Sequence, residues 1–266
     1  FHNISRIKLV IPVLRRNFNY LIACPETGEA LAVDPLEHQM CYDAAKNRGW
    51  EITNIVNTHE HGDHTGGNIG LKELSGAKII MAHEAAKNKI PAMNKSLKAG
   101  DIIKIGKSIE LEVLDTPGHT MAHVCLLSRG DTSALFSGDT LFNAGAGNCH
   151  NGGHPEKLYE TFINQLNKLD LKTLIYPGHD YLENNLKFTL SIEPNNIKAK
   201  NLLFSLKEKK SGFLVTDFAT EYEINTFFRL ENKQIIEELI KKFGRLEKTI
   251  SKKDVFLMLR ELRNSW

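Results

Sequence analysis

The sequence lacks a long apolar run: no stretch of its 266 residues approaches the ~20 consecutive apolar residues that a membrane-spanning helix needs. The first residues show no basic segment followed by an apolar one, so no uncleaved signal peptide is expected. Cysteine is scarce, and the four cysteines are widely spaced without a Cys-x-x-Cys pair. A disulfide framework is therefore not expected, and reduced thiols in a cytoplasmic protein are the simpler interpretation.

An excess of charge of one sign is also missing, since the formal net charge is +2 at pH 7. The charge is divided unequally, because residues 187–266 contain 16 Lys and Arg against 11 Asp and Glu. A basic C-terminal segment suits an anionic ligand, although a solvated helical surface has the same composition. No basic patch with interleaved aromatic residues and no RNA-reading motif accompanies it, so no nucleic-acid partner is expected.

Short β-branched and aliphatic runs between turn residues dominate the first part of the chain and predict β-strands. These strands are expected at residues 7–13, 20–24, 30–33, 52–56, 78–81, 101–105, 109–114, 124–127, 134–136 and 173–176. Helices are expected between them at residues 34–49, 67–74, 83–88 and 155–169. After them, apart from an extended piece at 213–216, amphipathic helices are expected at residues 181–191, 196–209, 232–243 and 251–263. The sequence thus predicts an α/β domain at residues 1–185 and a helical domain at residues 186–266.

Capping signals and glycine content refine this outline. Three expected helices begin with the spacing of a capping box, formed by Asp34 and Glu37, by Asp180 and Glu183, and by Ser251 and Asp254. Residues 143–153 are rich in glycine and carry no periodicity, which predicts an ordered loop.

Residues 58–64, Thr-His-Glu-His-Gly-Asp-His, hold three imidazoles and two carboxylates directly after the expected strand 52–56. Alternate residues of an extended segment share a face, so His59 and His61 are expected to point to one side. Asp63 and His64 follow where the chain turns, and they can point to a second place nearby. Imidazole nitrogen and carboxylate oxygen are the ligands that borderline divalent metals such as Zn²⁺ prefer.

Three later turns, at residues 116–120, 137–140 and 177–180, also place His or Asp directly after an expected strand. Loops at such positions on a rigid scaffold commonly carry function. With the first turn, they supply the metal-binding side chains His59, His61, His64, His119 and His179, with Asp63 and Asp139. These seven side chains are too many for one tetrahedral ion and suit two ions that share a carboxylate.

The four motifs, Thr-His-x-His-x-Asp-His, Pro-Gly-His-Thr, Ser-Gly-Asp-Thr-Leu-Phe and Pro-Gly-His-Asp-Tyr, resemble the successive motifs of the metallo-β-lactamase superfamily. Within it the sequence is most similar to the glyoxalase II family, the hydroxyacylglutathione hydrolases, from about residue 20 to 193. The resemblance implies an α/β fold, an αβ/βα four-layer sandwich with a binuclear site at one edge. It also implies a C-terminal helical domain that helps to hold the substrate.

The resemblance further implies one metal on His59, His61 and His119, a second on Asp63, His64 and His179, and Asp139 as the bridge. Zn²⁺ is the first choice of metal, and iron or manganese is compatible with the same ligands. Two cations lower the pKa of a shared water from near 16 toward ~7, so a bridging hydroxide is expected to attack the substrate's thioester carbonyl. Asp63 is expected to orient this nucleophile.

The substrate side departs from the family. Asn148 and His150 stand where the family carries a cation and a tyrosine, and a lost charge-assisted hydrogen bond costs about 1.5–3 kcal/mol of binding. Tyr181 and Asn185 match residues that contact glutathione in the family, and Arg263 matches the one that binds its glycine carboxylate. A glutathione thioester, S-D-lactoylglutathione, is therefore the expected substrate of a monomer or weak homo-oligomer.

Other functions on the same scaffold are alternatives: a different thioester or lactone hydrolase, a β-lactamase, a persulfide dioxygenase or a nucleic-acid-processing hydrolase. Common zinc β-lactamases carry Cys at the position of Asp139, and persulfide dioxygenases use a single iron and typically lack the long helical tail. Cys149 lies close to the expected site, but an activated hydroxide makes it unnecessary as a nucleophile.

Overall fold

The computed structural model describes residues 8–12, 16–130, 132–208, 213–244 and 250–266, and two six-stranded sheets form its centre. The first sheet has the order β1 (Lys8–Pro12), β2 (Phe18–Ala23), β3 (Glu29–Val33), β4 (Glu51–Val56), β5 (Ile79–His83) and β6 (Lys95–Leu97). The second has the order β14 (Thr216–Asp217), β13 (Leu174–Pro177), β10 (Ala134–Gly138), β9 (Val124–Ser128), β8 (Ile109–Asp115) and β7 (Ile102–Ile105).

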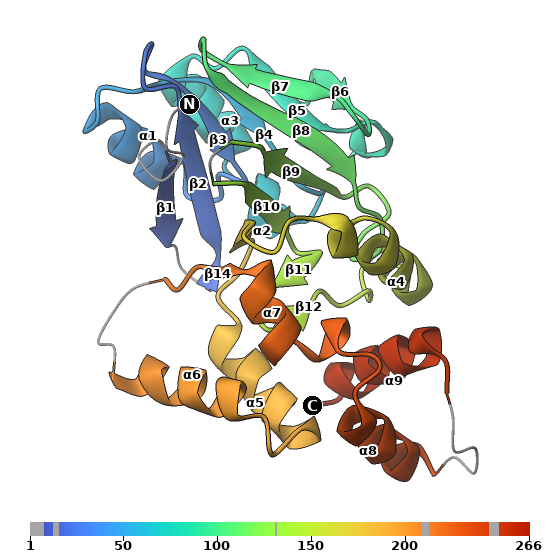
Figure 1. Cartoon of the computed structure of the whole chain (residues 1–266). Helices are drawn as coiled ribbons and strands as arrows, with labels where there is room; N and C mark the ends of the chain where they lie inside the picture. Colours follow the sequence, from blue (N-terminus) through green and yellow to red (C-terminus); the bar gives the residue numbers. More distant parts are fainter. Residues whose placement is uncertain (1–7, 13–15, 131, 209–212, 245–249) are drawn as a thin grey trace.

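Helices cover the outer faces of both sheets (Figure 1). The first sheet is accompanied by α1 (His38–Lys46), α2 (Gly62–Thr65) and α3 (Asn68–Ser75). The second is accompanied by α4 (Pro155–Asn164). The C-terminal helices form the lower part of the molecule in Figure 1, below the sandwich: α5 (Leu182–Ile192), α6 (Ile197–Glu208), α7 (Phe218–Ile224), α8 (Lys233–Phe243) and α9 (Lys252–Asn264). The expected αβ/βα four-layer sandwich with a C-terminal helical part is confirmed.

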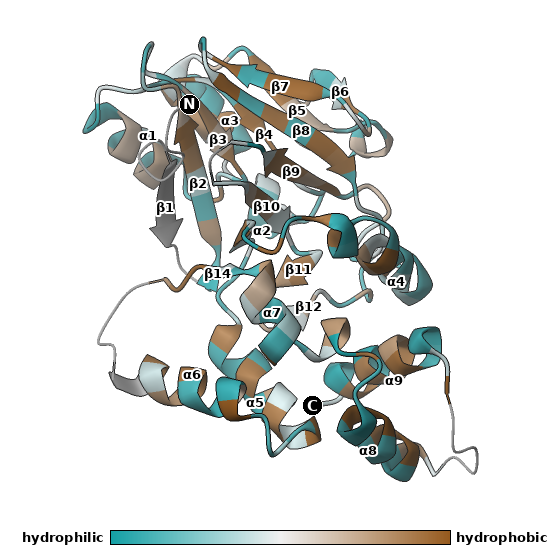
Figure 2. Cartoon of the chain, in the orientation of Figure 1, coloured by the Kyte–Doolittle hydropathy of each residue, from teal (hydrophilic) through white to brown (hydrophobic). Residues whose placement is uncertain are grey.

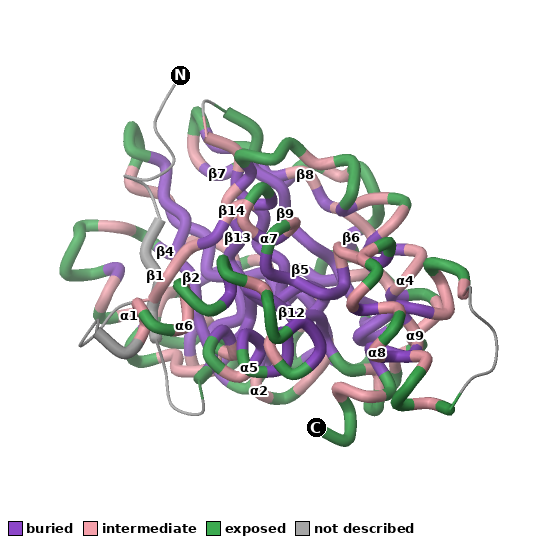
Figure 3. Tube along the Cα trace, turned by 60° about the horizontal axis from the view of Figure 1, so that its bottom comes forward, coloured by how far each residue is buried: buried purple, intermediate pink, exposed green. Residues whose placement is uncertain are grey.

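The central strands are buried on both faces, whereas β7 and β8 are exposed on one face. Alternate residues of a strand point to opposite sides of the sheet. In β2, Tyr20 and Ile22 enter the core between the sheets, while Leu21 and Ala23 pack beneath α1 and α3. Figure 2 shows the resulting apolar strands, and Figure 3 shows the buried strands inside more exposed helices.

The polar turns of the sequence meet at one edge of the sandwich. In the first sheet β3 and β4 are parallel, and in the second β10 and β13 are parallel. Strand β8 runs in the same direction as β10, since both are antiparallel to β9. The carboxyl ends of these strands are therefore close together, and each is followed by a turn that carries His or Asp.

Two of the three expected capping boxes are wrong. Helix α1 begins at His38, later than expected, and α5 begins after Tyr181; neither helix has a side-chain cap bond. The third is correct, because the Ser251 hydroxyl accepts from the Asp254 backbone N–H and the Asp254 carboxylate accepts from Ser251 N–H. Asp34 does not cap α1 because its carboxylate is used elsewhere, as described below.

The glycine-rich segment at residues 143–153 is not entirely loop. It contains part of a short hairpin formed by β11 (Leu141–Phe142) and β12 (Gly145–Ala146), with Asn143 and Ala144 at the turn. Strand β6 and helix α7 were not expected from the sequence either. The expected element ends at residues 7, 13 and 209 lie outside the described residues.

The C-terminal helices share their core with α4. Phe162 of α4 is fully buried, and its ring centroid lies 5.2 Å from that of Phe256 in α9 and 5.1 Å from that of Phe228. Strand β14, which precedes α7, also adds to the second sheet beside β13. Among the described residues, no helix combines the length and the hydropathy needed to cross a bilayer.

We predict that Phe162→Ala lowers the free energy of unfolding by about 3–5 kcal/mol, because it leaves a cavity beside the rings of Phe227, Phe228 and Phe256. Chemical denaturation followed by circular dichroism measures this change. The matched control is Phe204→Ala, since Phe204 is 63% exposed on α6 and its truncation should change stability by less than about 0.5 kcal/mol. Equal effects of the two substitutions would contradict the shared core.

Candidate metal centre and its pocket

The chain leaving β4 and the turn after β8 bring three imidazoles together. His59 Nε2 lies 3.0 Å from His61 Nδ1, and His119 Nε2 lies 3.1 Å from the same His61 atom. His59 is fully buried and His119 nearly so, while His61 is partly exposed. Three ring nitrogens thus converge on one point from two different turns.

A second cluster lies beside the first. His64 of α2 and His179, which follows β13, approach each other with 3.2 Å between their Nε2 atoms. Asp63 Oδ2 lies 3.5 Å from His179 Nε2. Asp139, which follows β10, stands between the clusters: its Oδ2 lies 3.5 Å from His119 Nε2 and 3.2 Å from His179 Nε2.

These donors fit two cations. Imidazole nitrogens at about 3 Å from one another cannot all be satisfied by hydrogen bonds among themselves, since each contact needs one proton and one lone pair. Asp139 Oδ1 is buried and has no hydrogen-bond partner among the described residues. The turn at Gly178 leaves this space open, because a Cβ there would lie 2.2 Å from Asp139 Oδ1. The donor set of nitrogen and oxygen suits borderline divalent metals.

The protonation states of the His and Asp side chains in the clusters depend on their burial and on the neighbouring carboxylates. Burial lowers the pKa of His59 and of His119, which keeps both rings neutral at pH 7. Burial also disfavours charge on His64, but the carboxylates of Asp139 and Asp34 outweigh it and raise the pKa of this ring. Burial raises the pKa of Asp139 less than the facing imidazoles lower it, so the group is ionised. A cation that binds here takes the place of the proton on His64.

Asp34 is the residue of this centre that the sequence did not reveal. Its backbone has a φ of 49°, and its carboxylate accepts from His64 Nδ1 at 3.0 Å and from the Thr58 hydroxyl at 2.7 Å. The Thr58 oxygen in turn lies 3.0 Å from His59 Nδ1. One buried carboxylate therefore orients two rings so that their Nε2 atoms face the clusters. Asp34 precedes a proline, a pattern typical of a helix start, so the sequence did not indicate that it orients the two rings.

His123 was left unassigned from the sequence, and the structure places it directly behind Asp139. Its Nε2 accepts from the Asp139 backbone N–H at 3.1 Å, so its proton lies on Nδ1, which faces the Thr116 and Thr140 hydroxyls at 2.9 and 3.1 Å. Its ring also stacks on His59 at a centroid distance of 5.0 Å. This neutral imidazole holds the Asp139 turn in place.

Backbone carbonyls of the glycine-rich segment orient the remaining rings. His119 Nδ1 donates to Asn148 O at 2.6 Å, and His61 Nε2 donates to Asn151 O at 3.0 Å. Each contact leaves the other ring nitrogen unprotonated and directed at the first cluster.

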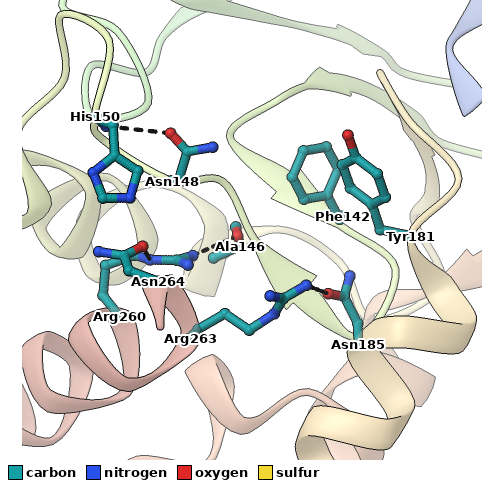
Figure 4. A pocket seen from close by; sticks show the side chains of 9 residues that line it. All are labelled: Phe142, Ala146, Asn148, His150, Tyr181, Asn185, Arg260, Arg263 and Asn264. Carbon is teal, nitrogen blue, oxygen red and sulfur yellow. Dashed lines mark hydrogen bonds between the residues drawn. The ribbon is translucent and has the colours of Figure 1, made fainter. Parts of the chain in front are cut away.

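A cavity of about 210 Å³ lies next to the clusters (Figure 4). It is lined by Phe142, Ala146, Asn148, His150, Tyr181, Asn185, Arg260, Arg263 and Asn264. All five residues expected to contact substrate are among them, and no acidic residue is. The Tyr181 ring stacks on His179 with 5.0 Å between centroids, which links the cavity to the second cluster. The cavity therefore suits an anionic ligand whose reactive end reaches the clusters.

The sequence did not single out Arg260 and Asn264, which lie on α9 with Arg263. Arg260 is 4% exposed, and its Nη1 donates to the carbonyls of Ala146 and Gly147 at 2.7 and 2.9 Å. Arg263 Nη2 donates to Asn185 Oδ1 at 3.3 Å. The sequence offers one indication that Arg260 lies near the cavity, namely its position three residues before Arg263 on the same helix. Its acceptors are more than 100 positions away in the chain, so no local pattern identifies them.

Cys149 is a thiol rather than a thiolate. Burial raises its pKa to about 11, and the nearby Arg260 guanidinium only partly opposes this. A thiol with this pKa is a poor nucleophile at neutral pH. The expectation that Cys149 is not the nucleophile agrees with these surroundings.

Known proteins resemble this chain along its whole length. Residues 18–181 match the family described as the metallo-beta-lactamase superfamily, and residues 180–266 match the hydroxyacylglutathione hydrolase C-terminus. A hydroxyacylglutathione hydrolase of Nitrosococcus oceani is 56% identical over 94% of this chain and 95% of its own length. A relative from Arabidopsis thaliana, named a cytoplasmic hydroxyacylglutathione hydrolase, is 33% identical over 86% of this chain and 90% of its own length.

Solved structures with low sequence identity share the fold. The crystal structure of ETHE1 from Myxococcus xanthus superimposes with a TM-score of 0.66 at 24% identity, covering 97% of this chain and 98% of that one. The BLEG-1 B3 metallo-beta-lactamase gives a TM-score of 0.64 at 19% identity, covering 84% of this chain and 99% of that one.

Two sheets with His and Asp clusters at one edge, together with the match over residues 18–181, define a member of the metallo-β-lactamase superfamily. The C-terminal match and the identity to full-length relatives narrow the class. The chain belongs to the hydroxyacylglutathione hydrolase family, whose members are thioester hydrolases.

We predict that Asp34→Asn weakens the binding of both divalent ions, and that of the ion held by His64 by about 10–100-fold, because His64 directly and His59 through Thr58 lose the carboxylate that orients them. Competition with a chromogenic chelator measures the affinity. Asp43→Asn makes the same chemical change at an exposed position of α1 and should leave both affinities as they are. Wild-type affinities in the Asp34 variant would exclude the orienting role.

Proposed function

We propose that this chain hydrolyses S-D-lactoylglutathione to D-lactate and glutathione at a centre of two divalent cations. The observation that carries the proposal is the acid-free cavity with two guanidinium groups that adjoins the His and Asp clusters through the stack of Tyr181 on His179. Such a cavity suits the carboxylates of a glutathione moiety and leaves its thioester beside the clusters.

In this proposal His59, His61 and His119 hold one cation, Asp63, His64 and His179 hold the other, and Asp139 joins them. Zn²⁺ fits this nitrogen and oxygen set best, and iron or manganese fits it too. When bound, two such cations supply hydroxide at neutral pH and polarise the thioester carbonyl.

The side chains around the clusters align the reactants. The carboxylate of Asp63 is 42% exposed, more than that of Asp139, so it can accept a hydrogen bond from the attacking water and direct it at the carbonyl carbon. Asn17 Nδ2 supports it by donating to the Asp63 backbone carbonyl at 2.9 Å. Attack forms a bond from the water oxygen to the acyl carbon, and the carbon–sulfur bond then breaks. One proton of the water passes to the departing sulfur, which gives the glutathione thiol, and the other leaves the acid for the solvent, which gives D-lactate.

The glutathione moiety is bound by residues of the cavity. Arg263 forms a charge-assisted hydrogen bond with a carboxylate, while Tyr181 and Asn185 line the path toward the clusters. Asn148 and His150, which face the same cavity, supply hydrogen-bonding groups in place of the family's cation and tyrosine. Acyl selection falls to the part of the site near Phe142 and His179, whose ring centroids are 6.0 Å apart.

Catalysis and substrate binding are assigned to successive parts of the chain. We assign the catalytic part to residues 1–185 and the substrate-binding helices to residues 186–266, although the two parts share strand pairs and core. A cytoplasmic location and a monomeric or weakly associating state accompany this proposal. A glutathione thioester is the only partner that it requires.

Comparison of two thioesters tests the substrate. S-D-lactoylglutathione and S-D-lactoyl-N-acetylcysteamine share the acyl group and the sulfur, but the second has no carboxylate. We predict at least about tenfold higher kcat/KM for the glutathione ester, and loss of most of this preference in Arg263→Met. Arg48→Met, at an exposed cation away from the cavity, should keep the preference. Equal kcat/KM for both esters in the wild type would show that the thiol carrier is not glutathione.

The joining role of Asp139 is tested separately. Asp139→Asn keeps the size of the side chain but loses the negative charge that faces the imidazoles of His64, His119 and His179, so metal content and activity should fall together, each by about tenfold or more. Metal analysis by mass spectrometry and the thioester assay give the two quantities. Full metal content with full activity would contradict the assignment.

A further inference from the structure

The hairpin segment, defined as residues 143–147, lies between the clusters and the C-terminal helices. Its turn residue Ala144 has a φ of 57°, in the left-handed region that a residue with a Cβ seldom adopts. Such a conformation is strained and persists where its surroundings determine it. The surroundings here are side chains from the C-terminal part of the chain.

The first of these side chains is Glu221 of α7, which is fully buried. Its carboxylate accepts from the backbone N–H of Ala144 at 2.9 and 3.1 Å. It is also hydrogen-bonded to the Thr216 hydroxyl at 2.7 Å and accepts from Asn225 Nδ2 at 2.8 Å. Burial raises the pKa of Glu221 to about 7, and these hydrogen bonds oppose the shift.

The same contact pattern continues along the hairpin segment. Asn185 Nδ2 donates to Asn143 O at 2.9 Å, and Asn225 Nδ2 donates to Gly145 O at 3.2 Å. Arg260 Nη1 then bridges the carbonyls of the last two residues, Ala146 and Gly147. Side chains of three helices and of the turn after α7 thus bind consecutive backbone groups of the hairpin segment.

The hairpin segment ends against the first cluster. The next carbonyl in the chain, Asn148 O, accepts from His119 Nδ1 at 2.6 Å. Gly147 packs so closely that a Cβ there would lie 1.8 Å from the Asp139 backbone oxygen and 3.1 Å from His119 Nδ1. A displacement of the hairpin segment would therefore turn the His119 ring away from His59 and His61.

The cationic charge of Arg260 makes this arrangement unusual. No described acidic group is among the recorded hydrogen-bond or ion-pair partners of its guanidinium, which uses two carbonyls and Asn264 Oδ1. Burial lowers its pKa to about 10, which shows the cost of holding the charge there. Arg263, one turn further along α9, faces the cavity and makes no recorded hydrogen bond to the hairpin segment.

We propose that Arg260 and Glu221 are positioning residues through which the C-terminal helices set the cation affinity of the cluster His59, His61 and His119. They hold the hairpin segment so that Asn148 O fixes the His119 ring. The proposal rests on the proposed function only in taking that cluster as a cation site. It makes one of two cation sites depend on helices that contribute no donor to it.

The test titrates metal-free protein with Zn²⁺ in competition with a chromogenic chelator. For Arg260→Met we expect about tenfold or greater weakening of one of the two sites and wild-type affinity at the other, because two charge-assisted hydrogen bonds are lost. Arg260→Lys keeps the charge and one donor, so it should restore part of the affinity. Arg263→Met is the matched control, since it should raise KM and leave both affinities unchanged.

A structural role alone would lower thermal stability without separating the two sites. Unchanged affinity at both sites in folded Arg260→Met would overturn the proposal and leave the proposed function intact. If wild-type protein bound fewer than two ions, the cation assignment itself would fail, and the proposal with it. Should Arg260→Met not fold, Glu221→Gln decides: it keeps one oxygen acceptor, and we expect about threefold weakening of one site, whereas two unchanged affinities would overturn the proposal.

Discussion

The centre depends on keeping one carboxylate, that of Asp139, charged inside the protein. A buried anion is unfavourable unless positive charge or hydrogen-bond donors face it, and here imidazole nitrogens lie 3.2–3.5 Å from its oxygens. Such convergence requires strand ends that do not move and turns that come very close together. Gly138, with a φ of 48°, and Gly178 allow this approach, because a Cβ at Gly138 would clash with Thr58 and His123, and a Cβ at Gly178 would clash with Asp139 and His64.

The metal-binding side chains are held in position by hydrogen bonds to a surrounding set of residues. Asp34 and Thr58 hold two rings, His123 holds the Asp139 turn, and carbonyls of residues 148 and 151 hold two more rings. For His59, His61 and His119 the ring nitrogen that faces away from the cluster is hydrogen-bonded, so the nitrogen that faces the cluster keeps its lone pair. This outer layer explains why a polar centre can be rigid without disulfide bonds, which are absent among the described cysteines.

The C-terminal helices take part in both substrate binding and the shape of the centre. One face of α9 presents Arg263 to the cavity, and the neighbouring Arg260 binds the backbone that borders the first cluster. The aromatic rings around Phe162 and the pairing of β14 with β13 join these helices firmly to the sandwich. The helical part therefore acts with the sheets as one body at the site, since their contacts are buried and apolar as well as polar.

The sequence by itself indicated the positions of most strands and the residues that form the clusters, and its resemblance to the metallo-β-lactamase superfamily indicated the four-layer fold. Short apolar runs predict strands, and His or Asp directly after such a run marks a polar turn at a strand end. The tertiary structure alone decided the roles of Asp34, His123 and Arg260, and the hairpin at residues 141–146. Their partners lie up to 114 positions away in the chain, and no local pattern encodes a hydrogen bond to a distant backbone group. Asp34 shows the reason most clearly: local spacing favoured a helix cap, but a buried imidazole offered its carboxylate a stronger partner.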